Sequence, residues 1–405
     1  MNSMRFVLLL LGLVLVGGCA AENDGEVLKV RAGWYRGNLH THSLWSDGDE
    51  FPERIVTWYR DHGYQFLAIS DHNTDHQGEK WVKYGDVYRK GSGRAADSYL
   101  RDFAASAQVR GDRSAGTQEI RLTPFPAYRA LLERPGQFLL IPSEEISDHF
   151  GKKPIHMIAT NIAEVIPPQG GRSVVEVITN NLRAVKEQGM LLGRPVLPHL
   201  AHPNFEWGVT AEEMAEVVEE HFFEIFNGHP LVHQQGDKDH PPVEKMWDIA
   251  NTLRIVAFHA PPLMGLATDD SHHYQVPGMT RAMPGRGWVC VHARELSPGS
   301  LIAAMEAGDF YASTGVELSA VTYDETAKTL TVEIEPDANA KSTTRFVGTL
   351  ADAAPGDVGT TLASVDGRRA VYQLTGRELY VRAVVTSDQD TRRPVWKGQK
   401  QQAWT

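Results

Sequence analysis

The fold is indicated most clearly by residues 66–73, which read Phe-Leu-Ala-Ile-Ser-Asp-His-Asn. Four apolar residues in a row predict a short buried strand, and the polar residues after them predict the loop in which it ends. Asp71 and His72 therefore follow a strand end, and both side chains are able to bind a metal. This arrangement is typical of an α/β protein whose active site lies at the carboxyl ends of its strands.

The same alternation of apolar runs and amphipathic stretches continues through the chain. Further buried parallel strands are predicted at residues 138–141, 155–158, 195–197 and 222–226. Amphipathic helices are predicted from Pro52, over residues 174–185 with Gly189 closing the helix, and from Pro298 after a Ser297 cap. Strands that alternate with helices predict a parallel sheet, and this number of units predicts a closed or nearly closed α/β barrel.

The N-terminal residues 1–19 read as a lipoprotein signal peptide. Arg5 precedes the short apolar run of residues 6–16, which is too short to span a bilayer comfortably. Residues 16–19, Val-Gly-Gly-Cys, resemble a lipobox, so we expect lipidation at Cys19, with plain signal cleavage as the alternative. Residues 20–33 would form a tether. We therefore expect a chain exported and lipid-anchored to the bacterial cell envelope, at the periplasmic face or the cell surface.

The C-terminal residues 316–405 have a different pattern. Residues 329–334 and 379–385 alternate apolar and polar side chains, as half-exposed antiparallel strands do. We expect a small β-sandwich-like domain here, without a chemical motif of its own.

Composition limits the classes of function. A chain of 405 residues with a net charge of −11 lacks the basic surplus of a general nucleic-acid binder, so no nucleic-acid partner is expected. Its 17 histidines need an explanation beyond packing.

Metal-capable residues follow nearly every predicted strand. They are His40 and His42, Asp47, Asp71 and His72, Glu144 and Glu145, His156, His199 and His202, and Asp269, Asp270 and His272. Two histidines separated by one residue share a face of an extended strand. Because the strand ends of an α/β barrel converge on one mouth, these distant residues are expected to meet there.

The order of these motifs resembles that of the PHP (polymerase and histidinol phosphatase) superfamily. Within this superfamily, the chain resembles the branch of secreted carbaryl-hydrolase-like proteins. The motifs are His-x-His, Ser-Asp-Gly, Ser-Asp-His-Asn, Glu-Ile-Ser, Ala-His-Pro and Asp-x-His, within residues 34–315. The resemblance implies a distorted (β/α)7 TIM-like barrel with two to three divalent metals. It implies one metal held by His40, His42, Glu145 and Asp270, a second held by Glu145, His156 and His202, and a third held by Asp47, His72 and His272.

Strand alternation and the motifs decide between neighbouring candidates. Glu144 and Glu145 point to opposite faces, and the motif favours Glu145. Asp270 shares a face with His272, which leaves Asp269 as the bystander. The motif favours His202 over His199, and His199 stays a candidate for substrate contact. Three further histidines are expected to lie near the mouth without binding metal: His149, His229 and His273.

Nitrogen and oxygen ligands without cysteine suit Zn²⁺, Mn²⁺ or Fe²⁺. We expect a metal-bridging hydroxide to hydrolyse phosphate mono- or diesters outside the cytoplasm. His199 or Asp71 would carry the leaving-group proton, and the sequence does not rank them.

Residues 77–143 form a long insertion between two of the motifs. It carries eleven Lys and Arg residues against seven acidic ones, a surplus of four positive charges. A basic lid, with Arg89, Arg94 and Arg101 as candidate substrate ligands, would favour a small anionic substrate such as a phosphate ester. The alternative is a solvated helical excursion.

Two other functions compete with the phosphoesterase. A carbamate or ester metallohydrolase would use the same ligands. A surface-anchored binding protein would keep the fold without turnover. The intact ligand set favours an enzyme over the binding protein.

Overall fold

The structure is a computed structural model that describes residues 33–91, 93–354 and 356–405. The expected signal peptide, the lipidation site Cys19 and all but the last residue of the tether lie outside these residues and stay predictions. In the part of the chain that is described, no helix combines the length and apolar character needed to cross a membrane.

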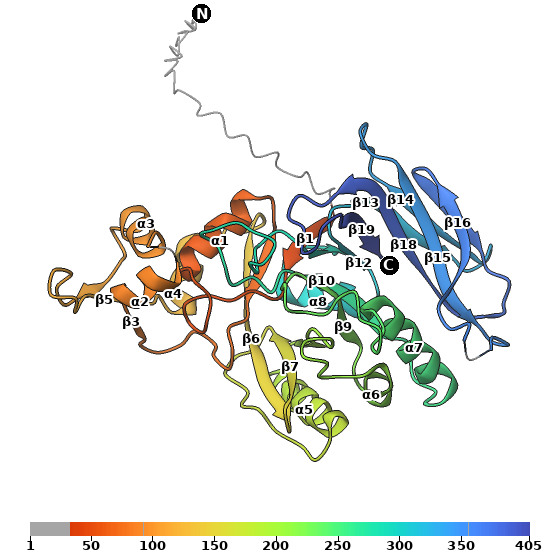
Figure 1. The fold of residues 1–405 in the computed structure, drawn as a ribbon, viewed down its shortest axis with the longest axis horizontal. Coiled ribbons are helices and arrows are strands. Elements are labelled where there is room, and N and C mark those ends of the chain that lie inside the picture. The colour runs from red at the N-terminus through yellow and green to blue at the C-terminus, as the bar shows by residue number, and fades with distance from the viewer. Residues whose placement is uncertain (1–32, 92, 355) are drawn as a thin grey trace, which may run out of the picture.

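Within the described ranges, thirteen strands join into one sheet (Figure 1). In their order across the sheet they are β10 (Met264–Thr268), β9 (Phe222–Asn227), β8 (Leu197–Leu200), β7 (Lys153–Thr160), β6 (Leu139–Phe150), β2 (Phe66–Ile69), β1 (Trp34–Asn38), β11 (Trp288–His292), β12 (Phe310–Ser313), β19 (Lys400–Trp404), β18 (Glu378–Asp390), β15 (Ser342–Leu350) and β16 (Thr360–Asp366). The protein is thus a mixed α/β fold.

Strand directions differ from the expectation at one place. β1 pairs with β2, β2 with β6, β8 with β9, and β9 with β10 in parallel. β7 runs antiparallel to both β6 and β8, so the prediction of a parallel strand at residues 155–158 is wrong. The physical reason is the short link: β6 ends at Phe150 and β7 starts at Lys153, which allows a hairpin but no crossover.

One face of the sheet encloses an apolar core. Phe66 and Ala68 of β2, Leu139 of β6 and Leu266 of β10 belong to one cluster of buried side chains, which α8 (Pro298–Glu306) also joins. Beyond their ends, β1 and β10 are linked by backbone hydrogen bonds, from the N–H of His42 to Ser271 O and from the N–H of Asp270 to His40 O, both 2.9 Å. A closed (β/α)7 barrel stays a prediction, because these bonds lie outside the strands.

Among the described residues, five helices pack against the other face of this part of the sheet. They are α1 (Pro52–Asp61), α4 (Phe125–Leu132), α5 (Val174–Leu192), α6 (Ala211–Glu216) and α7 (Val243–Val256), whereas α2 (Tyr84–Lys90) and α3 (Ala95–Asp102) lie in the insertion. α1 and α4 share a core with β2 and β6, and α5, α6 and α7 share one with β7, β8 and β9.

Helix α5 is longer than the sequence predicts. It continues past Gly189 to Leu192, and Gly193, with φ +61°, ends it in the left-handed conformation. Gly189 is needed for packing, since a Cβ there would lie 2.7 Å from a methyl group of Val196.

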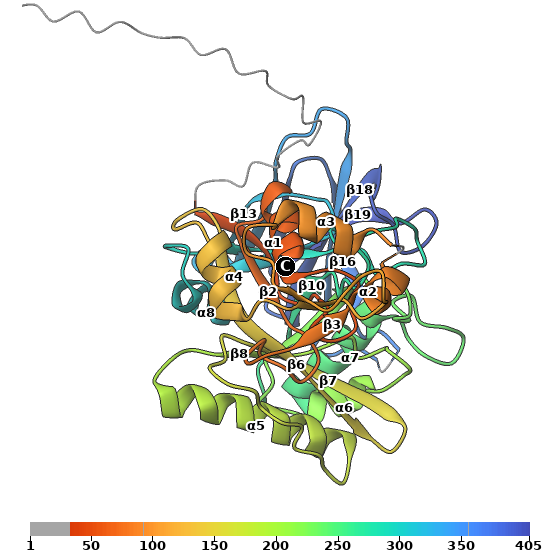
Figure 2. The ribbon, with the colours of Figure 1, turned by 90° about the vertical axis from the view of Figure 1, so that its left-hand side faces the viewer.

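The insertion forms a small lobe of its own. β3 (Trp81–Lys83), β5 (Glu119–Arg121) and β4 (Val109–Arg110) form a three-stranded sheet beside α2 and α3. This lobe lies at the opposite end of the molecule from β15 and β16 (Figure 1), and Figure 2 views the molecule from the lobe's side.

The C-terminal strands pack as two layers. β13 (Leu318–Asp324), β14 (Thr329–Ile334) and β17 (Arg369–Gln373) form the second layer, and Val332 and Tyr372 share a core with Phe346 and Val385 of the large sheet. A separate β-sandwich-like domain over residues 316–405 stays a prediction, because β19 pairs with β12 and joins these strands to the large sheet.

A buried ion pair fastens the C-terminal strands to α7. Arg382 of β18 donates two hydrogen bonds to Asp248, at 2.9 and 2.8 Å, and Tyr380 donates a third at 2.8 Å. Because both partners are 4% exposed, the geometry between α7 and β18 is closely constrained.

Buried Glu220, just before β9, predicts a pH dependence of stability. Its Oε1 accepts the N–H groups of His221 and Phe222, while its Oε2 is buried without a hydrogen-bond partner. Burial raises the pKa of Glu220 to about 7, against the opposing effect of these backbone hydrogen bonds. The folded protein therefore holds this proton more tightly than the unfolded chain does, so the contribution of Glu220 to stability falls as pH rises from about 4.5 to about 7.

We expect Glu220→Gln to stabilise the protein relative to the wild type by on the order of 2 kcal/mol more at pH 8 than at pH 5. Denaturant unfolding at both pH values measures this difference. The control is Glu219→Gln, because Glu219 is exposed and Arg183 lowers its pKa. A difference that is equal at both pH values would contradict the prediction.

Candidate metal centre

Four side chains from three strands and the loops after them bring donor atoms close together. His40 and His42 follow β1, Glu145 lies on β6, and Asp270 follows β10. The Nε2 atoms of His40 and His42 are 3.1 Å apart, and they lie 3.4 and 3.3 Å from Glu145 Oε2 and 3.3 and 3.2 Å from Asp270 Oδ1. Nitrogen and carboxylate oxygen donors this close together can bind one metal ion.

A second group of donors lies on the other oxygen of Glu145. Its Oε1 is 2.9 Å from His156 Nδ1 of β7 and 3.1 Å from His202 Nε2, just after β8. Glu145 therefore faces two sets of imidazoles with its two oxygens, which is the position of a bridging carboxylate.

The third group surrounds Asp47. Its Oδ1 is 3.2 Å from His272 Nε2 and 3.7 Å from His42 Nδ1, and its Oδ2 is 3.6 Å from His72 Nε2. Asp47 has a side chain that is 53% exposed, in contrast to the fully buried His42. The cluster thus opens to solvent on the side of Asp47.

All nine residues expected to bind metal are brought together. Within the described residues, four overlapping groups of donor atoms contain His40, His42, Asp47, His72, Glu145, His156, His202, Asp270 and His272. Ligation itself stays a prediction. The donor set fits it, because Glu145 Oε2 is buried without a hydrogen-bond partner although imidazole nitrogens surround it.

The charges of the cluster are strongly coupled. Burial alone would raise the pKa of Glu145, but His72, His40 and His156 hold it well below its ordinary value. Burial would lower the pKa of His72, and Glu145 and Asp47 instead raise it to about 11. Burial and the neighbouring His272 lower the pKa of His42 to about 4. The carboxylates are therefore ionised at neutral pH and attract further positive charge.

The backbone at Asp270 is strained. Its φ of +46° lies in the left-handed region, which residues with a Cβ seldom adopt. The N–H of Asp270 donates to His40 O, and Asn227 Nδ2 donates to Asp270 Oδ2 at 3.0 Å. These contacts hold the carboxylate toward His40 and His42.

The neighbours of two ligands behave as alternation predicts. Glu144 points away from the cluster and accepts the N–H of Ile166 at 2.6 Å. Asp269 also points away, and it accepts hydrogen bonds from Tyr59 and from the N–H groups of Gly285, Arg286 and Gly287. Asp269 therefore fixes a loop instead of binding metal.

Asp71 fastens the loop that carries Asp47. It accepts hydrogen bonds from Ser43 N at 2.8 Å and Ser46 N at 3.0 Å, and it pairs with His76 at 2.6 Å. Burial would raise the pKa of Asp71, but His76 above all holds it well below its ordinary value. An ionised, fully buried carboxylate has no proton to give, so a proton-carrying role for Asp71 stays a prediction that its surroundings do not favour.

His199 is also fully buried, on β8. Its Nε2 lies 3.5 Å from Glu224 Oε1, and burial lowers its pKa. Contact of His199 with a substrate, or transfer of its proton, stays a prediction that this burial does not favour.

Glu224 was not predicted from the sequence, although it contacts His40 and His202 of the cluster directly. Glu224, fully buried on β9, accepts hydrogen bonds from Thr268 Oγ1 at 2.7 Å and His202 N at 2.8 Å, and its Oε1 is 2.7 Å from His40 Nδ1. It orients His40 and leaves Nε2 of that ring for a metal. The signal was present, because a charged residue inside the apolar run of residues 222–226 requires buried partners.

The arginines expected to bind substrate lie on the insertion lobe. Arg89 is paired with Asp86, Arg101 is 2.8 Å from Asp102, and Arg94 is exposed. Their contact with a substrate stays a prediction. Two other exposed cations, Lys90 and Arg281, are close enough to Asp49, beside the third group, to oppose the rise in its pKa to about 6 that burial causes.

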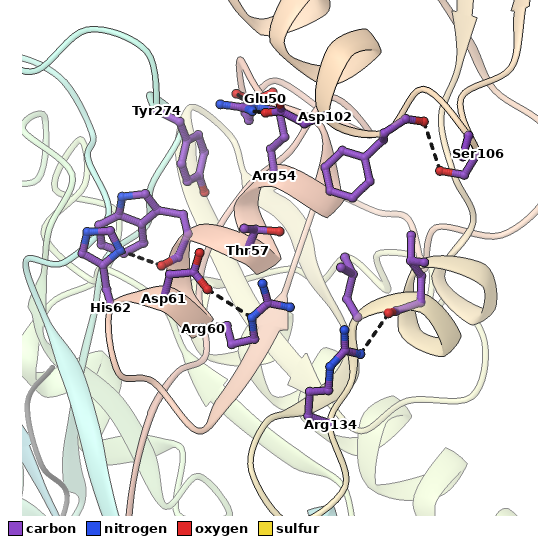
Figure 3. Close-up of a pocket in the computed structure, with 15 residues that line it drawn as sticks. Glu50, Arg54, Thr57, Arg60, Asp61, His62, Asp102, Ser106, Arg134 and Tyr274 are labelled. Atoms are coloured by element: carbon purple, nitrogen blue, oxygen red, sulfur yellow. Dashed lines mark hydrogen bonds and ion pairs between the residues drawn. The ribbon is translucent and has the colours of Figure 1, made fainter. Parts of the chain in front are cut away.

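A separate groove of about 750 Å³ runs along α1, and Figure 3 shows its lining. Trp58, Phe103 and Leu131 supply apolar walls. Its arginines have partners nearby: Arg60 is 3.1 Å from Asp61, and Arg134 donates to Leu131 O. None of the nine predicted ligands lines this groove.

Comparison with known proteins gives likenesses in structure only. No protein-family model matches the sequence, and no curated protein matches it. A solved two-domain protein of Bacteroides vulgatus, containing a predicted PHP-like metal-dependent phosphoesterase, matches with 15% identity, a TM-score of 0.42, and coverage of 96% of this chain and 99% of that one. A protein of Bifidobacterium adolescentis, assigned provisionally as a metal-dependent phosphoesterase, matches with 13% identity, a TM-score of 0.28, and coverage of 60% and 89%. Likeness at this level does not define an activity.

Glu224→Gln tests the support of the cluster. The amide keeps the size of the side chain but removes the charge that orients His40, so we expect Zn²⁺ affinity to fall about 10- to 100-fold. Competition with a chromophoric chelator measures this affinity. Glu220→Gln is the matched control, a buried carboxylate just before the same strand, and should bind Zn²⁺ as the wild type does. Equal affinity of the Glu224 variant and the wild type would contradict the role of Glu224.

Proposed function

We propose that the chain is a metal-dependent phosphoesterase of the PHP type, which hydrolyses phosphate mono- or diesters. The observation that carries this proposal is the position of Glu145, whose two oxygens face separate groups of imidazoles, 2.9 to 3.4 Å away. A carboxylate in this position is suited to bridge two metals.

The donors favour two to three divalent ions among Zn²⁺, Mn²⁺ and Fe²⁺, because nitrogen and carboxylate oxygen are the only ligand types in the four groups. When bound by these residues, such ions would lower the pKa of water, which supplies a hydroxide nucleophile, and would neutralise the charge of phosphate oxygens. We also propose the distorted (β/α)7 barrel, supported by the backbone hydrogen bonds that link the chain beyond the ends of β1 and β10.

A phosphoryl substrate suits three neighbouring donor groups better than a carbonyl does. A phosphate ester presents several charged oxygens and can contact more than one cation at once, whereas a carbamate or ester presents a single carbonyl oxygen. Exposed Lys90 and Arg281, whose charges oppose the rise in the pKa of Asp49, would attract an anion. In the reaction, water adds across the ester P–O bond and yields an alcohol and a phosphate, or a phosphate monoester when the substrate is a diester.

The protein's own groups would set the geometry. Asp71 fixes the loop of Asp47, and Glu224 fixes His40, so the donor atoms are held before a substrate arrives. The 53% exposed side chain of Asp47 marks the side from which a small anionic substrate would enter.

We also propose that the chain works outside the cytoplasm. The support is the signal-like sequence of residues 1–19 and the lipid-acceptor position of Cys19. Membrane contact would then occur through the lipid anchor alone, and the expected partner is a small phosphate ester instead of a nucleic acid.

Hydrolysis by the metal-loaded protein tests the proposal. We expect turnover of an aryl phosphate monoester or diester, no turnover of naphthyl carbamate, and a fall of at least about 10³-fold in kcat for Asp270→Asn. His62→Ala, a change of an exposed histidine in the separate groove, is the control and should keep full activity.

Carbamate turnover without phosphate turnover would replace the proposal with the carbamate or ester hydrolase. Bound metal without turnover of any of the three would favour a binding protein.

A further inference from the structure

A partly exposed aromatic ring lies beside the second donor group. Phe205 follows His202 by three residues, and its ring centroid is 5.3 Å from that of His202 and 6.3 Å from that of His156. The phenyl ring has no atom that can bind a metal. Phe205 instead supplies an apolar surface next to His156 and His202.

A histidine on the next loop borders the same surface. The ring of His229 lies 6.4 Å from Phe205 and 5.2 Å from His272, measured between ring centroids, at steep interplanar angles of 87° and 68°. His229 is partly exposed, and among the described residues the four donor groups do not include it. It therefore sits between the second and third donor groups without belonging to either.

The backbone fixes the tautomer of this ring. His229 Nδ1 accepts the N–H of Leu231 at 3.3 Å, so the neutral ring carries its proton on Nε2. The N–H of His229 donates to Asn227 Oδ1 at 2.8 Å, and Asn227 Nδ2 donates to Asp270. The backbone of His229 is thus tied to Asp270 through Asn227 of β9, and its ring presents an N–H donor at Nε2.

We propose that Phe205 and His229 form a leaving-group pocket, in which Phe205 packs against an apolar, preferably aromatic, alcohol portion of the substrate and His229 Nε2–H donates to the ester oxygen. This inference rests on the proposed phosphoesterase function. In a phosphate ester only the alcohol portion is apolar, and the oxygen attached to it is the one that leaves. A wall that pairs an apolar ring with a neutral donor matches that part of the substrate.

His229 has the same chemical form before and after the reaction. The bond between phosphorus and the ester oxygen breaks, and the oxygen departs with the electron pair. Water supplies its oxygen and one hydrogen to phosphorus and its second hydrogen to the alcohol. The hydrogen bond from His229 stabilises the negative charge that develops on the departing oxygen.

Leaving-group dependence tests the role of His229. For metal-loaded His229→Ala, we expect kcat/KM to fall about 100-fold on phenyl phosphate and less than about 10-fold on 4-nitrophenyl phosphate, because the more basic phenolate needs the hydrogen bond more. His229→Gln, which keeps an N–H donor, should recover at least about 5-fold on phenyl phosphate. His233→Ala, on the same loop, is the control and should match the wild type. Equal losses on both substrates, or no loss, would overturn the role of His229.

Ligand binding tests the role of Phe205 without turnover. We expect Phe205→Ala to weaken binding of phenylphosphonate to the metal-loaded protein about 10-fold and binding of methylphosphonate less than about 2-fold. Equal changes for both ligands, or no binding of phenylphosphonate to the wild type, would overturn the pocket. A wild type that binds phenylphosphonate better than methylphosphonate but hydrolyses neither phosphate would contradict the phosphoesterase function and leave the pocket supported.

Discussion

The structure depends on one buried carboxylate, Glu145 of β6. Its side chain is 1% exposed, and an ionised group in that position needs compensating positive charge. Five imidazoles surround the carboxylate, from His40, His42, His72, His156 and His202, with nitrogens 2.9 to 3.4 Å from the two oxygens. These histidines follow β1, β2 and β8 or lie on β7. Contacts with one carboxylate therefore bring together residues that are distant in sequence.

Three further buried carboxylates hold the loops that carry the ligands. Asp71 fixes the loop after β1, Asp269 fixes the loop before β11, and Glu224 fixes the rings and backbone of the central ligands. Each accepts several hydrogen bonds, which stabilises its charge away from water. The donor atoms of the cluster are therefore supported from outside by protein groups, as second-layer contacts support metal sites in general.

Much of this arrangement could be predicted from the sequence, and there are physical reasons why the remaining features could not. Ligand types followed from short motifs at strand ends, and strand alternation separated Glu145 from Glu144 and Asp270 from Asp269. The direction of β7 was predicted wrongly because an apolar run looks alike in parallel and antiparallel strands. Only the short link between β6 and β7 indicates the antiparallel direction. The charge of Glu224 within an apolar run indicated buried partners, but its contacts with His40 and Thr268 come from β1 and β10, which no local pattern identifies. The end of α5 was predicted wrongly because a glycine often ends a helix, whereas Gly189 allows the helix to pack closely against Val196.

The most direct test is anomalous X-ray diffraction from crystals of the purified protein, measured on both sides of the Zn, Mn and Fe absorption edges. The account predicts at least two peaks, one on each side of Glu145, with the first among the donor atoms of His40, His42 and Asp270. A fully ordered cluster without any anomalous peak, after crystals are soaked in Zn²⁺ and Mn²⁺, would contradict the account. It would mean that the histidines and carboxylates stabilise one another as ion pairs alone.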